Sequence, residues 1–134
     1  MKYFSIEELC KSDTATARGI DNTPNEEVKA NLEALIENVL DPLRKAYGKP
    51  IYVNSGYRSP ELNRAVGGVS NSQHVKGEAA DIDVYDTSEN QKLYDYITQN
   101  LDFDQCIWEN NGAWLHVSYK KDGNNRKQAF ALNA

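Results

Sequence analysis

Long apolar runs are missing from this sequence of 134 residues. The chain opens with MKYFSIEELCKS, in which Glu7 and Glu8 appear before any hydrophobic stretch develops. A transmembrane helix needs about 20 consecutive apolar residues, and a Sec-type signal peptide needs an apolar segment of about 7–15 residues. The sequence therefore predicts neither a membrane span nor a signal peptide.

Positive charge is also scarce. Lys and Arg number 15 against 20 Asp and Glu, which gives a formal net charge of −5. The longest basic features, Lys120-Lys121 and Arg126-Lys127, are short and flank a Gly-Asn loop. Proteins that bind along nucleic-acid phosphates need clustered basic residues, so no nucleic-acid partner is expected.

Cysteine occurs only at Cys10 and Cys106, without the CxxC spacing of zinc ribbons or thioredoxin-like motifs. Cys106 lies in the apolar run CIW and is predicted to be a buried hydrophobic residue. A disulfide between the two cysteines stays compatible with the sequence.

The composition is otherwise typical of a globular protein, with 40% hydrophobic and 26% charged residues. Neither an internal repeat nor a linker is visible. One domain spanning residues 1–134 is therefore expected, with enough chain to bury a core. We expect this domain to be a monomer.

The strongest helix signal covers residues 23–47. Thr23-Pro24-Asn25-Glu26 has the form of a capping box with proline at the first helical position. Apolar residues then recur at steps of three and four up to Tyr47, which is typical of an amphipathic helix. Pro42 predicts an interruption of this helix, and Gly48 predicts its end.

Weaker signals complete the predicted fold. We expect a helical turn at residues 4–12, a structured loop at 13–25, strands at 51–53, 79–84, 105–109 and 114–119, a short helix at 59–65, a glycine-rich loop at 66–74, a helix capped by Ser88, and an edge strand in the tail after residue 127. Asn111-Gly112 is a strong hairpin signal between two of these strands. The fold class indicated is α+β, with a small antiparallel sheet flanked by helices.

Both histidines of the chain lie near residues of types that bind metals. Between His74 and Asp81, Gly77 permits the chain to fold back and two alanines permit close approach. His116 lies on the predicted strand 114–119, on the face opposite its apolar neighbours. If this strand pairs near that of Asp81, two imidazoles and a carboxylate converge, a donor set that suits zinc in an open catalytic site. Taken singly, these residue types more often have ordinary structural roles.

The pattern Ser72-x-His74-x-x-Gly77-x-Ala79-x-Asp81, followed by Trp114-x-His116, resembles the M15 family of zinc D-alanyl-D-alanine peptidases. The resemblance extends to the segment SGYRS at residues 55–59 and to Gly19-Ile20-Asp21-Asn22, which is similar to the small carboxypeptidase branch. It implies a hedgehog/DD-peptidase-like fold. It also implies hydrolysis of peptidoglycan stem peptides, as carboxypeptidases, dipeptidases and phage endolysins of this family perform it.

The resemblance further implies a single Zn²⁺ ion held by His74, Asp81 and His116. Arg58 would then hold and polarise the substrate carbonyl or stabilise the oxyanion, a role that suits a permanently charged guanidinium. Further residues expected at the substrate or around the ligands are Ser72, Gln73, Tyr57 and Trp114.

The general base is where this sequence departs from part of the family. Some members have an acidic residue three positions before the last histidine, where this chain has Ala113. We expect Glu109 to act as the base instead, because strand ends lie side by side across a hairpin. Asp83, on the same predicted strand face as Asp81, is the competing carboxylate and a candidate for orienting a ligand.

Two other classes of function stay compatible with the sequence. One is a zinc-binding module without catalytic activity, and the other is a structural or partner-binding protein of phage or cell-wall machinery. As an enzyme, the chain is expected to be made in the cytoplasm and to reach the cell wall after phage-like release or by a non-Sec route. Exo and endo cleavage are equally compatible with it.

Overall fold

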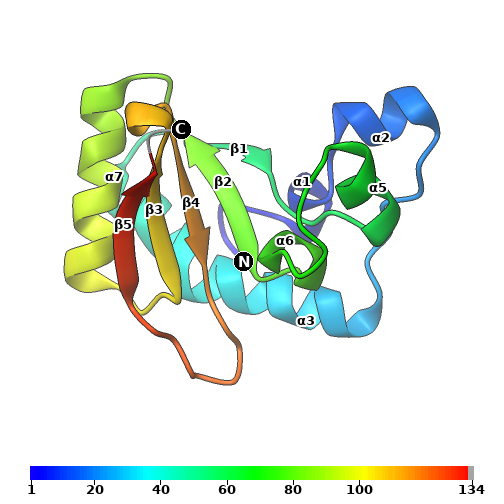
Figure 1. Cartoon of the computed structure of the whole chain (residues 1–134). Coiled ribbons are helices and arrows are strands. Elements are labelled where there is room, and N and C mark those ends of the chain that lie inside the picture. The colour runs from blue at the N-terminus through cyan, green and yellow to red at the C-terminus, as the bar shows by residue number, and fades with distance from the viewer. Residues whose placement is uncertain (133–134) are drawn as a thin grey trace.

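The computed structural model describes residues 1–132 (Figure 1). Its helices and strands are interspersed along the chain, with most of the helical residues before the central hairpin. In chain order the elements are α1 (Ile6–Leu9), α2 (Asp13–Arg18), α3 (Glu26–Leu35), the π-helical turn η1 (Ile36–Leu40), α4 (Asp41–Tyr47), β1 (Tyr52–Ser55), α5 (Pro60–Ala65), α6 (Gln73–Lys76), β2 (Ala79–Asp83), α7 (Thr87–Asn100), β3 (Gln105–Glu109), the 3₁₀ turn η2 (Asn110–Gly112), β4 (Trp114–Ser118) and β5 (Gln128–Leu132).

The strands form a five-stranded sheet in the order β1-β2-β4-β3-β5. The first three neighbouring pairs are antiparallel, as predicted. β5 pairs with β3 in parallel, so the sheet departs from the predicted antiparallel pairing at this edge. The cause is the loop of residues 119–127, which leads from the end of β4 past the start of β3, so that β5 runs beside β3 in the same direction (Figure 1). The α+β class itself is confirmed.

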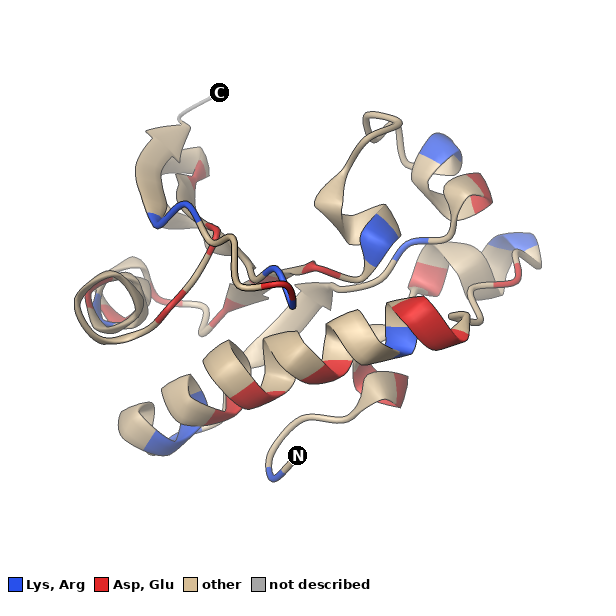
Figure 2. Ribbon diagram, turned by 90° about the horizontal axis from the view of Figure 1, so that it is seen from below, with Lys and Arg blue, Asp and Glu red and all other residues tan. Residues whose placement is uncertain are grey.

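A long helical segment made of α3, η1 and α4 supplies much of the core. Figure 2 shows its length, with acidic residues along its outward side. Its inward residues are at most 1% exposed and comprise Leu32, Leu35, Ile36, Val39, Leu40 and Leu43. The sheet contributes Ala80, Ile82, Leu115 and Val117, all fully buried in the same cluster. This apolar layer occupies one face of β2 and β4 and leaves their other face to polar side chains.

The interruption predicted at Pro42 is confirmed. The π-helical turn η1 lies directly before α4, in which Pro42 is the second residue. A proline has no backbone N–H and crowds the preceding turn, so regular α-helical bonding is lost there. The segment ends at Gly48, as predicted, with a left-handed φ of 77°.

Two predicted helix starts are wrong because another side chain makes the cap. α3 begins after Asn25, whose Oδ1 accepts a hydrogen bond from the backbone nitrogen of Val28 (2.9 Å). The backbone N–H of Thr23, which the predicted capping box would use, donates to Asp21 instead (2.9 Å). α7 begins after Asp86 rather than Ser88, since the Asp86 carboxylate accepts a bond (3.0 Å) from the backbone N–H three residues later.

Two predicted loops contain short helices. The first half of the loop expected at residues 13–25 is α2, whose N-cap is Ser12 (3.1 Å to the backbone nitrogen of Ala15). The glycine-rich loop expected at residues 66–74 ends early, because Ser72 caps α6. The strands β1 to β4 and the helix α5 begin and end within about two residues of their predicted limits. The predicted edge strand is present as β5.

Cys10 and Cys106 carry free thiols, and Cys106 is fully buried, as its apolar run predicts. Burial raises the pKa of the Cys106 thiol to about 12, so it stays protonated at neutral pH. Among residues 1–132, every helix is too short or too polar to span a bilayer.

Candidate metal centre

The pairing of β2 with β4 places Asp81 directly opposite His116. The Nδ1 atom of His116 lies 3.1 Å from Oδ1 of Asp81. Both side chains lie on the polar face of the sheet, because the residues on either side of them along the strands belong to the buried core. The strand pairing on which the sequence hypothesis depended is therefore confirmed.

The helix α6 brings His74 to the same carboxylate. His74 Nε2 lies 3.3 Å from Oδ1 of Asp81, and the His74 side chain is almost completely buried. Gly77 ends α6 with a left-handed φ of 76°, and a Cβ there would lie 2.9 Å from the backbone oxygen of Val28 in α3. Only glycine fits this turn without strain, which is why α6 can pack against α3 and still lead into β2. The fold-back predicted at Gly77 is confirmed, although His74 lies on a helix and not in a loop.

The donor atoms of His74, Asp81 and His116 all lie within 4.8 Å of one another. Two imidazole nitrogens and one carboxylate oxygen form a donor set that zinc takes in open catalytic sites. The Nδ1 of His74 lies 2.7 Å from the carbonyl oxygen of Gly56, which can only accept, so this nitrogen donates and Nε2 is the nitrogen available to a metal ion beside Asp81. The arrangement is suited to binding one divalent cation.

Asp81 is held in its ionised form. Burial alone would raise the pKa of its carboxyl, but the adjacent imidazoles of His116 and His74 outweigh burial and lower it well below its ordinary value. A carboxylate is the form that ligates a metal ion. The geometry and the charge of the site therefore agree.

An open cavity of about 410 Å³ lies over these side chains. Residues that line it include Arg58, Ser72, Gln73, Glu109 and Arg126. Polar and charged groups dominate this lining, so the cavity is suited to a polar ligand such as a peptide backbone.

Arg58 enters the cavity from the segment between β1 and α5. Its Nη2 lies 3.4 Å from Oγ of Ser72, and its Nε is buried without a protein partner among the described residues. Burial lowers the pKa of Arg58, and the Asp81 carboxylate partly offsets this effect. Because an arginine pKa starts above 12, the guanidinium stays charged.

Asn22 holds the backbone on both sides of Arg58, a function that sequence reasoning missed. Its Nδ2 donates to the carbonyl oxygens of Tyr57 (3.0 Å) and Cys10 (2.9 Å), and its Oδ1 accepts from the backbone nitrogen of Ser59 (2.7 Å). Asn22 belongs to the family-like stretch at residues 19–22, but no spacing in the sequence indicates which backbone groups it binds.

Glu109, at the end of β3, lines the same cavity. Ile107 pairs directly with His116, so Glu109, two positions further on, faces the same side of the sheet. Burial and the nearby Asp81 carboxylate raise the pKa of Glu109. A raised pKa brings a carboxylate closer to the range in which general bases work.

The remaining predicted residues have other surroundings. The Asp83 carboxylate accepts hydrogen bonds from Nδ2 of Asn90 (3.0 Å) and the backbone nitrogen of Tyr85 (2.7 Å), so it stabilises the start of α7; none of its bonds within residues 1–132 reaches His74, Asp81 or His116. Tyr57 is buried and lines a neighbouring cavity of about 300 Å³ that also reaches Arg58. Trp114 is half-buried beside Glu109, and its indole nitrogen has no hydrogen-bond partner in the described structure.

Comparison with known proteins identifies a family and a relative. The sequence model of the family described as Peptidase M15 matches residues 2–118. A stretch of 44 residues is 54% identical to the zinc D-Ala-D-Ala carboxypeptidase of Streptomyces albus G, and it covers 32% of this chain and 17% of that protein. The chain thus matches about a sixth of the length of this relative.

Proposed function

Since the chain belongs to the peptidase M15 family, we propose that it is a zinc peptidase that hydrolyses stem peptides of bacterial peptidoglycan. The observation that carries the proposal is the convergence of His74, Asp81 and His116 at the floor of an open polar cavity. The partial match to a zinc D-Ala-D-Ala carboxypeptidase supports a D-alanyl-D-alanine terminus, or a bond close to it, as the site of cleavage.

In this proposal His74 would hold zinc through Nε2, His116 through Nδ1, and Asp81 through its carboxylate. A zinc ion bound there supplies a Lewis acid and lowers the pKa of a water molecule toward neutrality. The chain provides three protein ligands and leaves the cavity side free, as a catalytic zinc site requires.

Glu109 is the proposed general base. One of its carboxylate oxygens accepts a proton from the attacking water and later donates that proton to the leaving amine. Its place on the cavity wall and its raised pKa support this role. Arg58 donates to the substrate carbonyl oxygen and stabilises the negative charge that develops there. Ser72, within hydrogen-bonding range of the Arg58 guanidinium, helps to hold it in place.

The proposal is tested with purified protein and defined muropeptides. Zinc content is measured first, and the products of digestion are then weighed by mass spectrometry, which identifies the cleaved bond and separates exo from endo cleavage. Removing a general base typically costs about 10²–10⁴-fold in rate. We therefore expect Glu109→Gln to lose hydrolysis to this extent while it keeps its zinc.

Glu33→Gln is a matched control, because Glu33 is an exposed carboxylate on the outward side of α3. A Glu109→Gln variant that hydrolyses at the wild-type rate would exclude Glu109 as the base. A zinc-loaded protein that cleaves no muropeptide would support a zinc-binding module without catalytic activity.

A further inference from the structure

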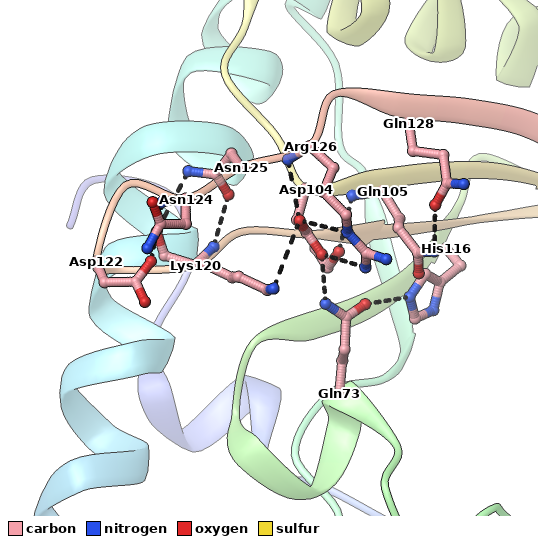
Figure 3. A network of polar contacts seen from close by, with 11 residues as sticks. Gln73, Asp104, Gln105, His116, Lys120, Asp122, Asn124, Asn125, Arg126 and Gln128 are labelled. Atoms are coloured by element: carbon pink, nitrogen blue, oxygen red, sulfur yellow. Dashed lines mark hydrogen bonds and ion pairs between the residues drawn. The ribbon is translucent and has the colours of Figure 1, made fainter.

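A chain of polar contacts leads from the segment before β5 to the ring of His116 (Figure 3). Arg126 donates from Nε and Nη2 to the two carboxylate oxygens of Asp104, at 3.0 and 2.7 Å. Nε2 of Gln73 donates to Oδ2 of Asp104 at 2.8 Å. On the other side of the same amide, Oε1 of Gln73 lies 3.4 Å from Nε2 of His116.

Asp104 determines the donor and the acceptor of each hydrogen bond in this series of contacts. Its carboxylate is fully buried, and burial by itself would raise the pKa. Hydrogen bonds from Arg126 and Gln73 outweigh burial and lower the pKa of Asp104 to about 2. The Nζ atom of Lys120 adds a second positive charge at 4.0 Å. At neutral pH the carboxylate is therefore ionised and accepts hydrogen bonds only.

This carboxylate also determines which group donates and which accepts in the contacts between Asp104 and His116. Because Asp104 only accepts, the amide of Gln73 must present its NH₂ group to it. The amide oxygen of Gln73 then faces His116, as Figure 3 shows. An amide oxygen also only accepts, so when a cation takes the place of the proton between Nδ1 of His116 and Asp81, Gln73 favours the tautomer in which Nε2 carries the proton. In that tautomer the lone pair is on Nδ1, the nitrogen that faces Asp81.

We propose that Arg126, Asp104 and Gln73 are positioning residues that hold the proton of His116 on Nε2 and so present Nδ1 to the metal centre. This inference rests on the proposed zinc site. The carbonyl oxygen of Gly56 has the complementary effect on His74, where it holds the proton on Nδ1 and leaves Nε2 free. The two imidazoles thus offer different nitrogens to one ion, each selected by an acceptor on its far side.

The first test uses the wild-type protein loaded with Zn²⁺ and labelled with ¹⁵N. Only two histidines have to be assigned. Two-bond ¹H–¹⁵N correlations of the rings report which nitrogen binds the ion and which carries a proton. We expect His116 to bind through Nδ1 with a proton on Nε2 and His74 to show the reverse. Binding of His116 through Nε2 would overturn the proposal without the need for any variant.

The second test is Gln73→Leu, which removes both ends of the amide. Loss of an outer hydrogen-bonding partner of a metal ligand typically weakens metal binding by about 10–100-fold. We expect the Zn²⁺ affinity, measured by competition with a chelator, to fall at least about tenfold, and the Nε2 proton of His116 to exchange faster with water.

Gln128→Leu is the matched control, because Gln128 is an exposed amide that bonds Gln105 (2.8 Å) and has no contact with His116. Wild-type affinity and proton exchange in Gln73→Leu would refute the inference. Neither measurement involves peptide hydrolysis, so these results stay separate from the success or failure of the proposed catalytic activity.

Discussion

Replacing Asn22 tests how the loop of Arg58 is held in place. The Asn22 side chain makes three hydrogen bonds to backbone groups, two as donor and one as acceptor. A protein hydrogen bond contributes about 1 kcal/mol net to stability. A buried polar group that loses its partner and gains no water molecule in its place lowers stability by more than that. Asn22→Ala is therefore expected to lower the free energy of unfolding by about 2–3 kcal/mol.

The assay is urea unfolding of the metal-free protein, so that zinc binding does not add to the measured stability. Asn22→Asp sharpens the test, because this variant has nearly the same shape and keeps the acceptor for Ser59. An ionised Asp cannot donate, and its carboxylate would face the carbonyl oxygens of Cys10 and Tyr57. We expect Asn22→Asp to be no more stable than Asn22→Ala.

The same variants separate positioning from metal binding. Asn22 holds the residues on both sides of Arg58, and a displacement of about 1 Å at a catalytic group costs on the order of 10²-fold in rate. We expect kcat to fall by about this factor in Asn22→Ala. The zinc affinity, measured in the same variant, reports separately on Gly56, which precedes Tyr57 and accepts a hydrogen bond from His74.

Asn38→Ala is the control for the loss of an asparagine, since Asn38 is exposed and makes only a local bond to Ala34 (2.8 Å) among the contacts described. Wild-type stability and activity in Asn22→Asp would refute the reasoning, because they would show that the two donated bonds contribute nothing.

Two further predictions concern acid stability and the turn after α6. The pKa of Asp104 is about 2 in the folded protein, against an ordinary value of 3.8. Between these pH values the unfolded chain binds more protons than the folded protein, so stability is lost as the pH falls from about 4 to about 2. The loss amounts to about 2 kcal/mol and is measured by urea unfolding at each pH. It should be smaller in Arg126→Gln, because this variant removes a positive charge beside Asp104. An unchanged pH profile in Arg126→Gln would contradict the assignment of this acid-dependent stability to Asp104. Gly77→Ala should lower the melting temperature, because φ is 76° and a Cβ would meet the backbone oxygen of Val28 at 2.9 Å. Gly77→Ala should also weaken zinc binding, because His74 lies on the helix that this turn ends. The control is Gly123→Ala: Gly123 has a similar φ of 88° but lies in open space, so this variant tests the effect of φ alone.

The core of the candidate site was predictable from the sequence because it depends on short-range patterns. Alternation along two strands puts Asp81 and His116 on one face and the apolar core residues on the other. The Asn-Gly signal predicts the hairpin that brings Glu109 near them. Gly77 predicts the reversal that delivers His74. Each of these inferences needs only a few neighbouring residues and the geometry of a regular element, whereas the pairing of β2 with β4, which joins Asp81 to His116, was a condition of the hypothesis and not an outcome of these patterns.

Other features follow from competition between nearby groups. Asn25 and Asp86 cap their helices in place of the predicted residues, since several side chains near each helix start are able to accept the same backbone hydrogen bond. The parallel pairing of β5 depends on the path of the preceding loop, which no alternation of apolar residues encodes.

By itself, the sequence determined the family, the polar face of the sheet and the three side chains that can share one ion. Only the tertiary structure decided that Asn22 holds the loop of Arg58 and that Gln73 connects Asp104 to His116. These contacts join residues more than 30 positions apart: the Asn22 contact links two irregular segments, and Gln73 links α6 to β4 and to the segment before β3. A periodic pattern reports which face of its own helix or strand is buried, but it does not report which distant side chain lies within hydrogen-bonding distance of the other face.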